Sequence, residues 1–128
     1  HDTADVYREL EDRGAVVVGE DHDHGELAVG ADVTEPSVEA IAERYRDNGP
    51  TPHHASMQER AAHTAAAVRR TGAELLLCYA RERDDAPTWD VPHQAAAVEV
   101  PTAVLTGQRY GTVDTAALER ALEQEARV

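Results

Sequence analysis

Apolar residues along the chain follow two spacings that alternate from one end to the other. Three short runs are apolar at nearly every position, which is typical of strands covered on both faces. Around them, apolar residues recur every three or four positions, as on one face of a helix. The pattern predicts strands over residues 15–21, 73–80 and 101–107, and helices over residues 3–13, 35–49, 56–72, 88–100 and 114–128.

Two of the expected helices carry further signals. The helix over residues 56–72 has the spacing of a capping box, Ser56 followed by Glu59, and Gly72 supplies a stop. The helix over residues 35–49 has one apolar face, made of Val38, Ile41, Ala42 and Tyr45.

Unalternated strands separated by helices predict a parallel sheet with helices on both faces. The expected fold is therefore α/β: three layers, a small parallel sheet of about three strands, and a Rossmann- or flavodoxin-like order. A length of 128 residues suits one domain over residues 1–128. In such folds ligands bind beyond the carboxyl ends of the strands, so we expect a site at the edge of the sheet where the strands end.

The chain is acidic, with 25 Asp and Glu against 12 basic residues and a formal net charge of −13. Every basic residue is an arginine. Because phosphates and anionic lipids attract basic patches, the charge argues against nucleic-acid and membrane partners. An acidic surface without lysine is typical of a halophilic protein in a salty cytoplasm, and GC-rich coding is the other explanation. No apolar run has the roughly 20 residues that span a bilayer, and no signal-peptide pattern opens the sequence, so we expect a cytoplasmic protein.

The single cysteine, Cys78, follows three leucines inside the second expected strand. One cysteine excludes a disulfide framework within the chain. A thiol in such a run is typically a small buried apolar side chain. A nucleophile would need an electropositive and partly exposed setting, and a cluster ligand would need its thiolate at the end of the strand. We prefer the buried interpretation and leave the other two open.

Polar residues that suit a site gather after the first expected strand. Glu20 and Asp21 stand at its carboxyl end, where they are candidate substrate-binding carboxylates, with a loop cap as the alternative. Histidines follow in two loops that together offer enough groups for a zinc site, although runs of His and Asp are also common in acidic surface loops. The candidate metal ligands are His22, His24, His53 and His54.

Several motifs occur in the order found in one protein family. The sequence contains VVGEDHDHG, IAERYRDNGPTP, RRTGAELLL, DVPHQAAAVEVPTAVL and GTVDTAALERALE. In order and spacing these resemble the C-terminal region of the D-component of 2-hydroxyacyl-CoA dehydratases and of benzoyl-CoA reductase subunits. The corresponding family patterns are VVGDD…G, AxRYxxxxPCP, GADGV(I)…FCDP…DYP…GIP and TRLEAFxE. The resemblance covers nearly the whole chain.

The resemblance implies that this is the C-terminal domain of a larger subunit. The family carries out radical chemistry on a CoA thioester, as a lyase or an acyl-CoA reductase. A [4Fe-4S] cluster would then be held in the parent protein. The implied partners are the missing N-terminal domain, a second homologous subunit and an ATP-dependent activator.

Departures from the family pattern fall at the ligand positions. With Asp90, Val91 and Pro92 aligned on the motif DYP, Asp84 stands where the family has its cluster cysteine. The candidate cluster ligands in this chain are therefore Asp84, by position, and Cys78, six residues earlier. We expect no cluster in this domain alone. The alternatives to an enzyme are a non-catalytic relative that serves as a binding or scaffold domain, and a small metal-binding module built on the histidines.

Overall fold

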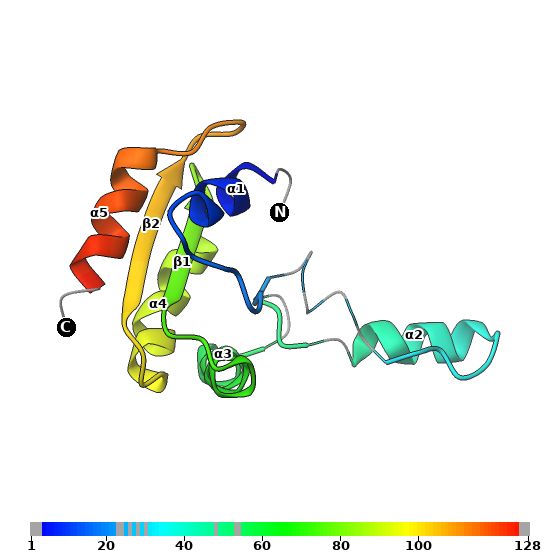
Figure 1. Cartoon of the computed structure of the whole chain (residues 1–128). Coiled ribbons are helices and arrows are strands. Elements are labelled where there is room, and N and C mark those ends of the chain that lie inside the picture. The colour runs from blue at the N-terminus through cyan, green and yellow to red at the C-terminus, as the bar shows by residue number, and fades with distance from the viewer. Residues whose placement is uncertain are drawn as a thin grey trace.

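The computed structural model describes residues 4–22, 25, 27, 29, 31–47, 49–52 and 55–125. Within them the chain forms a mixed α/β fold with a small parallel sheet (Figure 1). The elements in chain order are α1 (Asp5–Glu11), α2 (Val38–Arg46), α3 (Met57–Thr71), β1 (Leu76–Arg81), α4 (Ala86–Ala97), β2 (Thr102–Gln108) and α5 (Thr115–Glu125).

The sheet consists of β1 and β2, which pair in parallel through the crossover helix α4. Leu76 lies opposite Thr102 and Tyr79 lies opposite Leu105, and the register then shifts before Arg81. The α/β class and the parallel pairing of the second and third expected strands are confirmed. Parallel strands need such a crossover, which the helical spacing after β1 correctly indicated.

The main hydrophobic cluster lies where α1 and α5 meet the sheet. Val6 and Leu10 of α1 pack with Leu105 of β2 and with Leu118 of α5, which is 0% exposed. Leu77 and other half-buried residues surround this cluster. In Figure 1, α1 lies in front of β1 while α4 lies behind it.

Helix α3 packs along α4 through small side chains, and its ends are those that the sequence predicted. The Ser56 Oγ accepts from the Glu59 amide at 3.2 Å, and a Glu59 carboxylate oxygen accepts from the Ser56 amide at 2.8 Å. Gly72 follows the helix with φ of 66°, a left-handed conformation that glycine adopts without strain. The side chains that α3 buries are Ala61, Thr64, Ala65 and Ala67.

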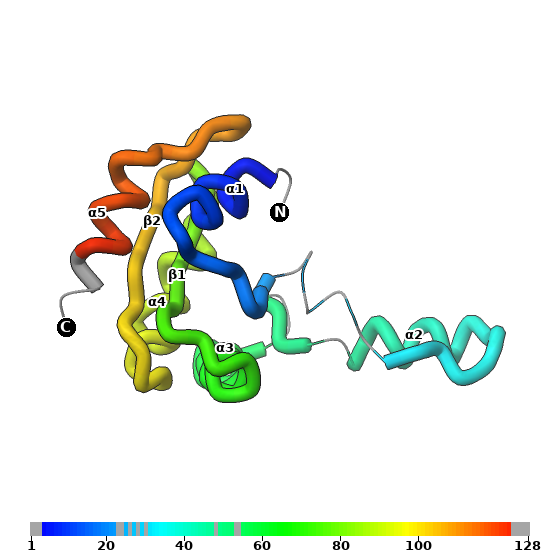
Figure 2. Tube along the Cα trace, viewed as in Figure 1, coloured from blue at the N-terminus to red at the C-terminus, as the bar shows by residue number. Residues whose placement is uncertain are grey.

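The strand expected over residues 15–21 is the part of the fold prediction that was wrong. Residues 15–21 belong to no strand, and Val16 is 74% exposed. Ala15 packs against the hydrophobic cluster, but Val17 and Val18 are also exposed. A β-branched run favours an extended backbone, yet a strand forms only where another strand offers its backbone groups. Figure 2 follows this segment away from α1 toward the region before α3.

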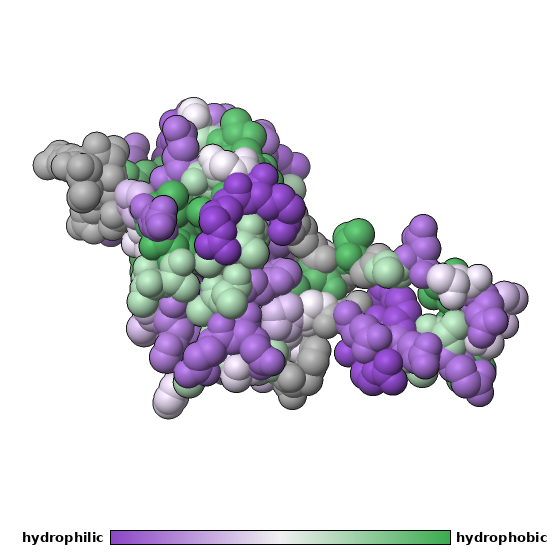
Figure 3. Space-filling model, turned by 90° about the horizontal axis from the view of Figure 1, so that it is seen from below, coloured by the Kyte–Doolittle hydropathy of each residue, from purple (hydrophilic) through white to green (hydrophobic). Residues whose placement is uncertain are grey.

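Helix α2 stands away from the other elements (Figures 1 and 2). None of its residues is buried. The apolar face that the sequence predicted for this helix is therefore not covered by the rest of the described chain. Figure 3 shows the same part of the molecule projecting from the body, with apolar and hydrophilic side chains intermixed on its surface. Among the described helices, none combines the length and the apolar content needed to cross a membrane.

Candidate functional site

Glu20 and Asp21 lie in the segment between α1 and α3, and each contacts a different helix. The Glu20 carboxylate hydrogen-bonds with Tyr7 of α1 and lies 3.5 Å from Nε2 of His22. Partial burial, and then the Glu20 carboxylate, raise the pKa of Tyr7 to about 12. Glu20 and Tyr7 line a surface pocket together with Glu11 and residues 17–19. The tyrosine is therefore a neutral hydrogen-bond donor to the carboxylate at neutral pH.

Asp21 enters a buried polar network between α3 and α4. The Thr64 hydroxyl donates to Oδ2 of Asp21, and it accepts from Nε2 of Gln94 at 3.0 Å. A second acceptor within reach of the same hydroxyl is the Arg60 carbonyl, at 3.0 Å. This threonine joins three segments that are distant in sequence, and we call Asp21, Arg60, Thr64, Asp90 and Gln94 the polar network.

An ion pair between Arg60 and Asp90 holds the centre of the polar network. Nε of Arg60 donates to Oδ2 of Asp90 at 2.7 Å, and Nη2 donates to Oδ1, so the pair is bidentate. Nη1 of Arg60 donates to the Ala55 carbonyl. Asp90 is 5% exposed, and the hydrogen bonds that Arg60 donates to it raise the pKa of Arg60 above its ordinary value, against the effect of burial. The pair therefore ties α3 to α4 in a setting that excludes most solvent.

His63 lies beside the network and was not selected from the sequence. Its Nε2 lies 4.0 Å from Oδ1 of Asp21 and, among the described residues, makes no hydrogen bond. On α3 it stands three residues after Arg60 and directly before Thr64, and no spacing or motif in the sequence marks it as part of a site. A protonated His63 would form an ion pair with Asp21 at this distance.

The candidate metal ligands are only partly placed. His22 contacts Glu20, as above, whereas His24, His53 and His54 lie outside the described residues. In the described ranges, no three His, Cys, Asp or Glu side chains are grouped so that they would hold a metal ion.

Of the two candidate cluster ligands, Cys78 lies within β1 and Asp84 lies in the turn that follows it. Asp84 is exposed in the turn after the strand, where its amide donates to the Arg81 carbonyl at 3.1 Å. Cys78 is half-buried inside the strand. Burial, and then the negative charges of Asp84 and Asp90, raise the pKa of the Cys78 thiol to about 11. An iron–sulfur cluster requires several thiolates, and this region offers one disfavoured thiolate and an exposed carboxylate. These residues do not fit a [4Fe-4S] cluster.

Cys78 is expected to react slowly in the folded chain. A rise in pKa from 9.0 to about 11 lowers the thiolate fraction near neutral pH about 100-fold, and the thiolate is the reactive form. We expect alkylation by iodoacetamide at pH 8 to be slower by about that factor in the native chain than in the denatured chain. Comparable rates in the two states would contradict the protonated, half-buried thiol.

The polar network is suited to holding helices together rather than to attack on a substrate. The Thr64 hydroxyl is buried and engaged on both sides, and the Arg60 charge is matched by Asp90. The Glu20 pocket, with its tyrosine, is open to the surface. Comparison of the chain with protein-family models, with curated proteins and with solved structures finds no match.

Proposed function

We propose that this chain is a binding or scaffold domain, a non-catalytic relative of the 2-hydroxyacyl-CoA dehydratase D-component and benzoyl-CoA reductase subunits. The observation that carries the proposal is α2, whose apolar face is turned to solvent. Val38 is 77% exposed and Tyr45 is 64% exposed, with Ile41 between them. Amphipathic helices of soluble proteins normally bury such a face, and an uncovered one marks an interaction site.

The residues near the end of β1 support the non-catalytic half of the proposal. Asp84 occupies the place of the family's cluster cysteine, and the pKa of Cys78 is raised rather than lowered. A relative that had lost its cluster would keep the α/β scaffold and its contacts with partners. The proposed partners are an N-terminal domain of the same protein and a second homologous subunit, in a salty cytoplasm that the net charge of −13 suits.

The finer architecture belongs to the same proposal. We infer a three-layer, Rossmann- or flavodoxin-like arrangement in the complete protein, with a sheet larger than β1 and β2. The exposed valines of residues 16–18 support this inference, because a β-branched run is the type of sequence that adds to a sheet edge.

An active enzyme is the competing proposal, and the Glu20 pocket favours it. A carboxylate held beside Tyr7 in a surface pocket can accept hydrogen bonds from a polar substrate. In that proposal the parent protein would act on a CoA thioester, with its cluster ligands outside this chain and an ATP-dependent activator as electron donor.

Anaerobic reconstitution with ferrous iron and sulfide tests whether this domain holds a cluster ligand of its own. We expect the purified chain to bind no stoichiometric iron and to develop no visible absorption, because it offers no set of thiolates. The variants Cys78→Ser and Asp84→Ala should behave like the unmodified chain. Asp85→Ala is the matched control, since Asp85 is the neighbouring exposed carboxylate and makes no capping hydrogen bond. Iron that is lost in Cys78→Ser or Asp84→Ala and kept in Asp85→Ala would overturn the non-catalytic proposal.

A further inference from the structure

We propose that α2 docks in antiparallel orientation against α2 of a second copy of this chain. The proposal rests on the binding role proposed above and names the partner. It is carried by the face that α2 leaves open and by the distribution of charge along that helix.

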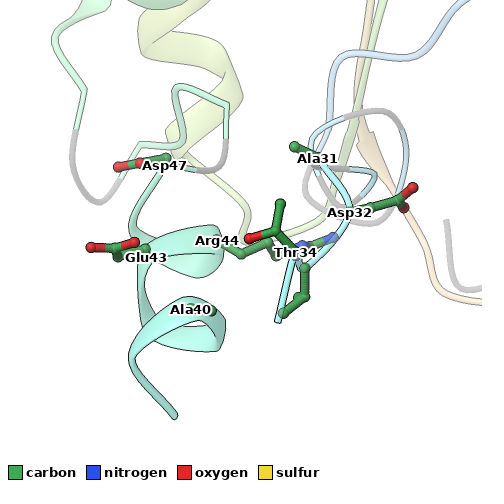
Figure 4. A pocket seen from close by; sticks show the side chains of 8 residues that line it. Ala31, Asp32, Thr34, Ala40, Glu43, Arg44 and Asp47 are labelled. Carbon is green, nitrogen blue, oxygen red and sulfur yellow. The ribbon is translucent and has the colours of Figure 1, made fainter. Parts of the chain in front are cut away.

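The open face of α2 is its apolar face because another segment covers the opposite side. Ala40 and Arg44 are half-buried against residues 31–34, with which they line a pocket (Figure 4). In Figure 4 the Arg44 side chain extends toward Thr34, and Glu43 lines the same pocket. In the part of the chain that the structure describes, the positions on the remaining side are exposed, and these are Val38, Ile41, Ala42 and Tyr45. The helix is therefore braced on its polar side, and its apolar side is available to a partner.

The charges along α2 favour a second copy in the antiparallel orientation. Glu39 and Arg46 are seven residues apart, which is close to two helical turns, so they lie on the same flank of the apolar face. A two-fold axis near the middle of the helix would bring Glu39 beside Arg46 of the second copy, where it would share that guanidinium with the exposed Asp47 of the same chain, and by symmetry Arg46 beside its Glu39. In a parallel pair this flank of one helix faces the opposite flank of the other, so Glu39 and Arg46 do not meet.

The same two-fold axis also brings apolar residues of the two helices into contact. It places Val38 opposite Tyr45 of the second copy, and it places Ile41 near the axis, where the two copies of this side chain meet. Helix α2 carries two acidic and two basic residues, so it is locally neutral in a chain of net charge −13. Two such acidic chains would approach with least repulsion along this helix.

The interface is small, so we expect the dimer to be weak. Each helix contributes nine residues, less than the 20–30 residues a side of a standard stable interface. We therefore expect a concentration-dependent dimer with a dissociation constant on the order of 100 μM. Added salt should strengthen it, because screening reduces the repulsion between the acidic bodies more than it weakens two exposed ion pairs.

Sedimentation velocity over a range of protein and salt concentrations tests the proposal. We expect Ile41→Glu and Glu39→Arg each to weaken the dimer at least tenfold, and the double variant Glu39→Arg with Arg46→Glu to restore it. Glu99→Arg is the control, because it changes the net charge equally at an exposed position outside α2. Since the apolar face of α2 is not buried within the chain, circular dichroism and the melting temperature should be unchanged in all of these variants.

A chain that stays monomeric at millimolar concentration and molar salt would overturn the proposal. So would a dimer that Ile41→Glu leaves intact, or a charge reversal that does not restore association. These outcomes are independent of the iron measurement, which reports on residues around β1. Failure of the dimer and failure of the non-catalytic role are therefore distinguishable.

Discussion

Replacing Asp90 with alanine is expected to lower the free energy of unfolding by about 3–5 kcal/mol. The substitution removes the carboxylate that binds Arg60 through two hydrogen bonds. It leaves the arginine charge with the Ala55 carbonyl and the weaker influence of Asp21 and Glu59. An uncompensated charge in such a setting costs more than the pair itself contributes. Urea unfolding followed by circular dichroism measures the loss.

A double-mutant cycle separates the pair from the unpaired charge. Replacing both Arg60 and Asp90 with apolar residues of similar size should destabilise the chain less than Asp90→Ala alone, because no charge is then left buried. Asp47→Ala is the control, since its pair with Arg46 is exposed on both sides and should make no measurable contribution. Equal losses in Asp90→Ala and Asp47→Ala would show that the Arg60 pair does not join the two helices.

Leu118→Ala is expected to destabilise the chain by about 2–5 kcal/mol. Leu118 has no exposed surface and lies in the cluster formed by Val6, Leu10 and Leu105, so its truncation leaves a cavity where three elements meet. Chemical denaturation gives the free energy, and 1-anilinonaphthalene-8-sulfonate binding reports any loosening of the core.

Leu122→Ala is the matched control on the same helix. Leu122 is only partly buried against the cluster, so less apolar surface is lost and the effect should be smaller. A loss below about 1 kcal/mol in Leu118→Ala would mean that α5 does not anchor this face of the sheet.

Local signals in the sequence predicted the parts of the fold that depend on neighbours in the chain. Ser56, Glu59 and Gly72 define both ends of α3, because caps and stops act within a few residues. The runs of consecutive apolar residues likewise predicted β1 and β2, because such a run is a property of the local sequence. The strand predicted over residues 15–21 is absent, because a strand also needs a partner strand, and no local pattern specifies that partner.

The polar network could not be found in the sequence because its members are distant from one another. Asp21 and Thr64 are 43 residues apart, and Arg60 and Asp90 are 30 apart. Glu20 and Asp21 were selected for their place after an expected strand, and the structure instead gives them Tyr7 and Thr64 as partners. His63 was missed because a single histidine on a helix carries no motif of its own.

The two-stranded sheet also affects the tendency of the chain to aggregate. Within the described residues, each strand has one edge without a strand neighbour, and the exposed valines at positions 16–18 form a run with strong β propensity. Open edges and such runs are the usual starting points of aggregation between chains. The net charge of −13 opposes that association by mutual repulsion. Mutual repulsion between acidic chains is therefore expected to keep these open edges apart, and this repulsion weakens in acid as the carboxylates take up protons.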